Sequence, residues 1–127
     1  MATLKQWTCL HELISRGTLK QFIAERSKYE SISPIRIAIE AISEGRSDIL
    51  FLLIMAELTD SEMEQAWLFD LAAMKGDIPC LQVLHDAGMD LHHIKDKDAL
   101  IITLTRDEKL DALDLLRDWG LEADILD

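Results

Sequence analysis

One segment, residues 67–90, constrains the fold of this chain more than any other. An alanine pair, Ala72-Ala73, stands just before Gly76, and a helix rich in leucine and valine follows the glycine. Residues 87–90, Ala-Gly-Met-Asp, close that helix. Glycine readily adopts the left-handed conformations that end helices and form tight turns. The segment therefore predicts two short helices that are joined by a tight turn at Gly76.

The same segment resembles one unit of an ankyrin repeat. The family pattern runs T-P-L-H-x-A-A-x-x-G-H-x-x-V-V-x-x-L-L-x-x-G-A-D, and Ala72-Ala73, Gly76 and residues 87–90 match it. The resemblance implies an all-α fold of stacked antiparallel helix pairs, an ankyrin-like solenoid. Such a stack forms a rigid surface that binds another macromolecule, and it seldom forms an active site.

Glycines mark similar boundaries along the rest of the chain. Gly17, Gly45 and Gly76 each lie between two apolar helical patterns, and Gly88 and Gly120 each follow one. Recurrence of this kind is typical of repeating structural units. We therefore expect a single domain, residues 1–127, built from units that span approximately residues 4–32, 33–60, 61–92 and 93–127.

The predicted helix starts match the family to different degrees. Thr8-Cys9-Leu10-His11 is a near copy of T-P-L-H and stands before Gly17. Ser33-Pro34 opens the second unit with an expected N-cap and a proline at the first helical position. Residues 99–105 keep nothing of T-P-L-H, and their apolar side chains are compatible with either a helix or a strand.

Periodicity alone also predicts a helical protein. Apolar residues recur at i, i+3 and i+4, whereas strict alternation is scarce. Ser61 and Glu64 have the spacing of a capping box. We expect about seven or eight short helices, with an irregular helical bundle as the alternative to a stack of pairs. The predicted core consists of Leu10, Leu13, Phe22, Ile37, Leu50, Leu53, Leu71, Ala72, Leu81, Leu84, Leu113 and Leu116.

Hydropathy predicts a soluble protein of the cytoplasm. No apolar run approaches the roughly 18 residues that a membrane-spanning helix needs. His11, Glu12 and Arg16 interrupt the start of the chain, which therefore lacks the apolar stretch of a signal peptide. We expect the compartment to be the cytoplasm of the producing cell, or of a host if the protein comes from a phage or a pathogen.

The two cysteines are expected to be reduced thiols. Cys9 and Cys80 fall in units two steps apart, and packed helices stand about 8–10 Å apart, which is beyond disulfide reach. Reduced thiols agree with a cytoplasmic setting. Cys9 with His11, or Cys80 with His85, supplies too few ligands for a metal site, so we expect no metal and no cofactor.

Catalytic motifs are scarce in this sequence. It contains no glycine-rich phosphate loop, no Gly-x-Ser-x-Gly and no Cys-x-x-Cys. His92-His93, with Asp90, Asp96 and Asp98 nearby, is the one cluster that resembles an active site. Adjacent side chains of an extended segment point in opposite directions, so we do not expect both histidines to bind one ion. We expect no enzymatic activity.

The same turn is a candidate contact for a partner. In the register of the family, His92, His93, Lys95 and Asp96 lie on the extended turn between the third and fourth units. Ankyrin-like proteins often bind through such turns, so the resemblance implies a binding role here. The alternative is a polar, solvated turn with no partner.

Trp67 stands where the family pattern has Thr, at the start of a helix. A large aromatic residue at this place is either a wedge that covers Phe69 and Met63 or an exposed anchor for a partner. Tryptophan is enriched among the residues that dominate binding energy. A partly buried structural role is the alternative.

Charge is distributed unevenly along the chain, which has a net charge of −11. Residues 1–50 contain seven Lys/Arg and six Asp/Glu, whereas residues 51–127 contain six Lys/Arg and eighteen Asp/Glu. The acidic half disfavours direct contact with DNA, RNA or anionic lipid. It suggests a protein partner with a basic surface, or an acidic surface that only keeps the protein soluble.

Four aspartates are expected to form an acidic stripe near the end of the chain. At about 100° per residue, Asp107, Asp111, Asp114 and Asp118 fall within an arc of roughly 60° on one helix. The stripe is either the solvated outer face of a terminal helix or a surface that docks on a basic partner. In the second case its carboxylates imitate a run of phosphates.

Three classes of function follow. The first is a small acidic inhibitor, antagonist or immunity-type protein that binds a basic protein, for example one that handles nucleic acid. The second is an adaptor or scaffold subunit of a complex, and the third is a metal-dependent enzyme at the His92-His93 turn. The sequence leaves the oligomeric state open and favours a monomer over a dimer formed through an exposed terminal unit. The expected partner-binding residues are Asp107, Asp111, Asp114, Asp118, His92, His93, Lys95, Asp96 and Trp67.

Overall fold

The computed structural model describes residues 3–121, and all regular structure in this range is helical. The segment 99–105, which was compatible with a helix or a strand, is helical. Within the described range there are nine α-helices and two short 3-10 helices, more α-helices than the sequence led us to expect. They are α1 (Leu4–Arg16), α2 (Leu19–Glu25), η1 (Arg26–Tyr29), α3 (Pro34–Ser43), α4 (Ser47–Ala56), α5 (Asp60–Gln65), α6 (Leu68–Lys75), α7 (Ile78–Asp86), η2 (Leu91–His93), α8 (Lys97–Arg106) and α9 (Leu110–Asp118).

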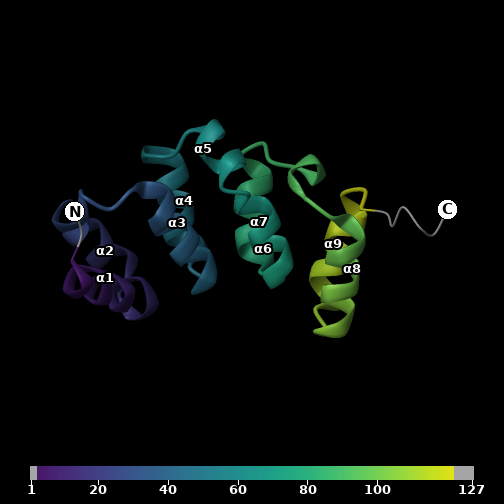
Figure 1. The fold of residues 1–127 in the computed structure, drawn as a ribbon, viewed down its shortest axis with the longest axis horizontal. Helices are drawn as coiled ribbons and strands as arrows, with labels where there is room; N and C mark the ends of the chain where they lie inside the picture. The colour runs from purple at the N-terminus through teal and green to yellow at the C-terminus, as the bar shows by residue number, and fades with distance from the viewer. Residues whose placement is uncertain (1–2, 122–127) are drawn as a thin grey trace.

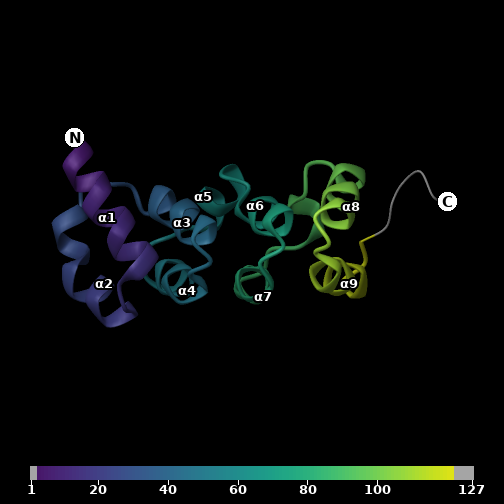
Figure 2. The same ribbon diagram turned by 90° about the horizontal axis from the view of Figure 1, so that it is seen from below.

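The long helices lie in two rows along an elongated molecule. Consecutive helices pack as pairs: α1 with α2, α3 with α4, α6 with α7, and α8 with α9. Neighbouring pairs touch through α1, α3, α6 and α8, which we call the first row, and through α2, α4, α7 and α9, the second row. Figure 2 shows the two rows side by side, and Figure 1 shows α1 and α2 at one end with α8 and α9 at the other.

The buried core lies between the rows and contains almost every residue predicted for it. Eleven of the twelve predicted core residues are buried. Leu71 is the exception, because it is half-buried and packs at the edge of the core. In α6 the face toward the core is formed by Leu68, Phe69, Ala72 and Ala73, all fully buried. At about 100° per residue, position 71 points well away from that face.

Buried residues recur at a fixed distance before each turn of the first row. The residues three and four positions before Gly17, Gly45 and Gly76 are all buried. Leu104 stands four positions before Glu108 and is buried as well. The backbone is left-handed at Gly45 (φ 71°), Gly76 (φ 73°) and Glu108 (φ 59°). Glu108 therefore occupies the turn position that glycine takes in the two preceding pairs.

The capping box at the start of the third unit is not where the sequence analysis placed it. Thr59 accepts a hydrogen bond from the Glu62 N–H (3.1 Å), and Glu62 accepts one from the Thr59 N–H (3.2 Å). The prediction of Ser61 with Glu64 was wrong by two residues. Because α5 begins at Asp60, Ser61 already lies inside the first turn of the helix.

Basic side chains connect neighbouring pairs through the ends of first-row helices. Arg46 donates hydrogen bonds to the carbonyls of Ile14 and Gly17 (2.6 and 2.7 Å) at the end of α1. Lys75 donates likewise to the carbonyls of residues 42–43 at the end of α3. The last carbonyls of a helix have no partner within the helix and attract positive charge. Each of these cations therefore fixes one pair against the pair before it.

Both cysteines are free thiols, as the spacing of the units predicts. Cys80 is buried in α7, and its pKa is raised to about 12, mainly because burial disfavours the thiolate. Cys9 is exposed on α1. Cys80 therefore behaves as a small apolar core residue.

Candidate functional site

Three of the four predicted stripe residues lie on one exposed helix face. Asp111, Asp114 and Asp118 are exposed on α9, and we call these three residues the α9 stripe. The prediction that Asp107 belongs to the same helix was wrong. Asp107 caps the end of α8 and pairs with Arg106 (3.3 Å). The left-handed backbone of Glu108 separates the two helices and breaks the helical arc that the sequence suggested.

The α9 stripe places three like charges close together on one helix. Within residues 3–121, no Lys or Arg forms an ion pair with any of its three aspartates. Arg117, in the last turn, is the single basic residue within α9. Like charges at i, i+3 and i+4 repel each other by a few tenths of a kcal/mol. A positively charged group of another molecule would therefore reduce the repulsion between these aspartates.

A groove with both charged and apolar lining residues lies at the start of α9, next to the stripe. It is lined by Gly76, Ile78 and residues 108–112. Leu110 in this lining is 52% exposed. The surface beside Asp111 thus offers an apolar contact together with the negative charge.

One exposed position recurs in each helix of the second row, and the type of side chain at this position differs from helix to helix. Ile23, Phe51, Gln82 and Asp114 each stand six residues after the turn residue of their own pair, and all four are exposed. The first two are large apolar side chains, each 54% exposed. At this position the exposed side chain is therefore apolar in α2 and α4 and acidic in α9.

A second group of predicted residues gathers around Trp67, between α5 and α6. Trp67 is 36% exposed and has a left-handed backbone (φ 54°). The Lys95 ammonium lies 4.9 Å from the centroid of its ring, a cation–π contact. His93 Nε2 lies 3.4 Å from a carboxylate oxygen of Glu64, the third residue before Trp67. Lys95 thus contacts Trp67 itself and His93 contacts Glu64 of the preceding helix, and we call Trp67, His93 and Lys95 the Trp67 group.

His92 and His93 lie in a 3-10 turn and not in the extended segment that the sequence analysis assumed. The Asp90 N–H donates to His93 Nδ1 (3.1 Å), and Asp90 Oδ1 accepts from the His92 N–H (2.9 Å). These bonds form a cap, and the one from the His92 N–H is the main reason that the pKa of Asp90 is lowered. His92 extends into solvent with its side chain 92% exposed.

Asp96, the remaining residue of the predicted turn contact, has a structural role. Its side chain accepts a hydrogen bond from the Ala99 N–H (3.0 Å) and caps the start of α8. Asp70 of α6 lies near Lys95 and Asp96, and its pKa is raised mainly by burial. The segment between η2 and α8 is therefore held to the first row by its own polar contacts.

The predicted partner-binding residues consequently fall into two groups. The α9 stripe belongs to the second row, whereas Trp67 immediately precedes α6 of the first row (Figure 2). A partner that covers one group does not have to cover the other.

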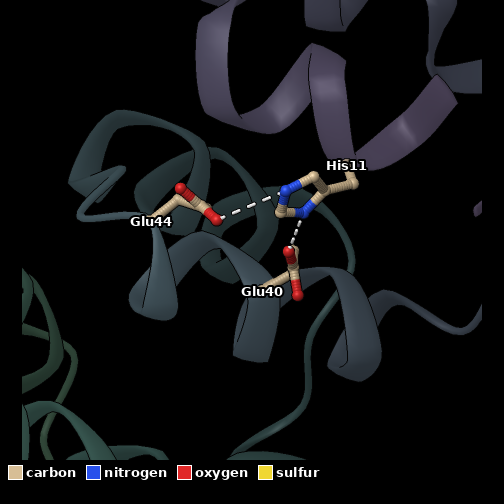
Figure 3. A group of neighbouring side chains, drawn as sticks. All are labelled: His11, Glu40 and Glu44. Carbon is tan, nitrogen blue, oxygen red and sulfur yellow. Dashed lines mark hydrogen bonds and ion pairs between the residues drawn. The ribbon is translucent and has the colours of Figure 1, made fainter. Parts of the chain in front are cut away.

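A third cluster, His11 with Glu40 and Glu44, was missed by the sequence analysis. His11 lies on α1, Glu40 lies on α3, and Glu44 caps the end of α3 (Figure 3). One ligand atom from each residue lies within 4.8 Å of the others, and within residues 3–121 this is the one such His/Cys/Asp/Glu group with metal-ligand spacing. The sequence signal was the Glu pair at i, i+4 on one helix. Its relation to His11 depends on how α1 packs on α3.

Comparisons with known proteins add no assignment: no family model matches the chain, and no curated protein or solved structure matches it. The resemblance to ankyrin repeats therefore depends on the sequence signals alone. Within residues 3–121, no helix is both long enough and apolar enough to cross a bilayer.

Proposed function

We propose that this chain is an ankyrin-like stack of helix pairs that binds a basic protein, as a small inhibitor, antagonist or immunity-type protein. The observation that carries the proposal is the α9 stripe: three exposed aspartates on one helix face, without a basic ion-pair partner in the described part of the chain. A stripe that only kept the protein soluble would not need a single sign of charge.

Electrostatics explains how the stripe would act. Side chains at i, i+3 and i+4 on a helix are about 5–6 Å apart, so their carboxylates present a row of closely spaced negative charges. A row of this kind competes with phosphates for a surface of Lys and Arg. Complementary fields also accelerate the encounter of two proteins. A partner that otherwise handles nucleic acid fits this chemistry.

The groove at the start of α9 adds a contact that charge alone does not provide. Leu110 stands at the first position of the helix and remains half exposed beside Asp111. Binding interfaces combine a desolvated apolar centre with a polar rim. Leu110 with the α9 stripe has this composition, so an apolar residue flanked by basic residues is the expected feature of the partner surface.

Affinity capture from the native cell tests the proposal. The Asp111→Asn, Asp114→Asn double variant should lose the captured partner, because it removes two of the three charges of the stripe. The matched control, Glu12→Gln with Glu30→Gln, changes the net charge equally on exposed residues of α1 and of the end of η1, and should retain the partner. Equal capture by both variants would refute a role for the stripe.

An adaptor is the second candidate, and the division of the exposed residues into two groups supports it. An adaptor binds two proteins at once, and the α9 stripe and the Trp67 group lie on different rows. Mass measurement of the native complex distinguishes the candidates. An inhibitor forms a complex with one partner, whereas an adaptor forms a ternary complex in which Trp67→Gly releases one protein and the stripe variant releases the other.

A further inference from the structure

The cluster of His11, Glu40 and Glu44 connects the first two helix pairs and has no part in the function proposed above. Glu40 and Glu44 are one helical turn apart, and His11 reaches them from α1 (Figure 3). The His11 side chain is 52% exposed, and the two glutamates are about one-third exposed. Small ions and water therefore have access to the cluster from solvent.

The contact with Glu40 determines which ring nitrogen carries the proton. His11 Nδ1 forms a short hydrogen bond with Glu40 Oε1. An ionised carboxylate can only accept, so Nδ1 is the donor. In the neutral imidazole the lone pair is then on Nε2. A carboxylate that holds one ring N–H while the other nitrogen binds a metal is the usual arrangement around metal-binding histidines.

The distance from Nε2 to Glu44 fits an ion better than a hydrogen bond. Nε2 lies 3.7 Å from Glu44 Oε1, which exceeds the length of a hydrogen bond. Two ligand atoms at about 2.0–2.1 Å from one tetrahedral ion are separated by about 3.3–3.4 Å. A movement of a few tenths of an ångström would therefore place both atoms on one metal ion.

The charge of the cluster also favours a cation. Within residues 3–121, no Lys or Arg forms an ion pair with Glu40 or Glu44. The Ser15 hydroxyl, 3.4 Å from Nε2, donates its hydrogen to the His11 carbonyl (2.8 Å). A hydroxyl has one hydrogen to donate, so the Nε2 lone pair receives no strong hydrogen bond from Ser15.

We propose that His11 Nε2 and Glu44 bind a divalent transition-metal ion, represented by Zn²⁺, and that Glu40 orients the imidazole. Nitrogen with carboxylate oxygen suits Zn²⁺ and its neighbours in the first transition row better than Mg²⁺ or Ca²⁺, which prefer oxygen alone. The ion would connect α1 to α3. Water would complete its coordination and leave positions at which a partner could contribute a ligand.

Calorimetric titration of the metal-free full chain with Zn²⁺ at pH 7.5 tests the proposal. We expect one site, with the affinity lowered at least tenfold by His11→Ala and by Glu44→Gln. Glu40→Gln should lower it less, by about threefold to tenfold, because the amide oxygen still accepts from Nδ1 while its charge is lost. Mg²⁺ and Ca²⁺ at millimolar concentration should not compete.

The controls are His92→Ala, which removes the most exposed histidine of the η2 turn, and Cys9→Ser, which removes the exposed thiol of α1. Both should bind Zn²⁺ as the wild type does. Zn²⁺ should also raise the Tm of the wild type and of both controls but not of Glu44→Gln, since the ion joins two helices of the folded state. Absence of Zn²⁺ binding, or binding that His11→Ala leaves intact, would overturn the proposal.

Discussion

Two residues other than glycine, Trp67 and Glu108, have a left-handed backbone in the described chain (φ 54° and 59°). This conformation costs an L-residue roughly 1–2 kcal/mol, whereas glycine adopts it freely. Glu108 stands at the turn between α8 and α9, where Gly45 and Gly76 stand in the preceding pairs. Trp67 separates α5 from α6, and its exposed ring faces Lys95. At both positions the surrounding packing must offset the backbone strain.

Glu108→Gly should stabilise the protein by about 0.5–1 kcal/mol. The substitution removes the left-handed strain, and the greater freedom of glycine in the unfolded chain offsets part of that gain. Urea unfolding measures the change. The opposite substitution, Gly76→Ala, should be destabilising, because φ is 73° and the new Cβ would lie 3.0 Å from Lys109. Loss of stability in Glu108→Gly would show that the Glu108 side chain contributes more than its backbone costs.

At the scale of elements, the ends of the first-row helices depend on cations from the next pair. Lys75 binds two carbonyls at the end of α3, so Lys75→Met should cost about 1–2 kcal/mol by leaving them without that donor. Lys20→Met is the matched control, because Lys20 is exposed on α2 and the substitution changes the charge equally. Its effect should stay within about 0.5 kcal/mol. Equal unfolding free energies for the two variants would contradict the role of Lys75.

The sequence predicts the elements best where a local signal is unambiguous. Gly76 was expected to join two helices, and it caps α6 with a left-handed backbone. Thr59 with Glu62 and Ser61 with Glu64 both satisfy the capping-box spacing, so the sequence alone could not choose between them. The structure adopts the first, and Met63 is then buried in the core. Tertiary packing decides between local signals of equal strength.

The candidate sites were less predictable, because they depend on breaks and contacts that no local pattern shows. Asp107 was assigned to the stripe on the assumption of a continuous helix. The left-handed backbone of Glu108 separates α8 from α9, although glutamate is not a residue that usually marks a helix end. His11 meets Glu40 and Glu44 only because α1 packs on α3. The break between α8 and α9 and the contact of His11 with the two glutamates become visible only once the packing of the helices is known.

At the scale of the whole molecule, the second row exposes different side chains toward its two ends. Ile23 and Phe51 are exposed toward one end, and the α9 stripe is exposed toward the other. Three of the eighteen acidic residues in residues 51–127 thus lie together on the last helix, α9. Under the proposed function, a basic partner would approach the end formed by α8 and α9.

The salt dependence of association with the captured partner tests the proposed function most directly. For the wild type, the association rate should fall steeply as salt is added, because screening weakens the attraction between the α9 stripe and a basic surface. The Asp111→Asn, Asp114→Asn variant should associate more slowly at low salt and with a flatter dependence. Its unfolding free energy should be unchanged or a few tenths of a kcal/mol higher, because like-charge repulsion within α9 is reduced. Identical rates for the two proteins at every salt concentration would contradict the account and leave the stripe as solvated surface.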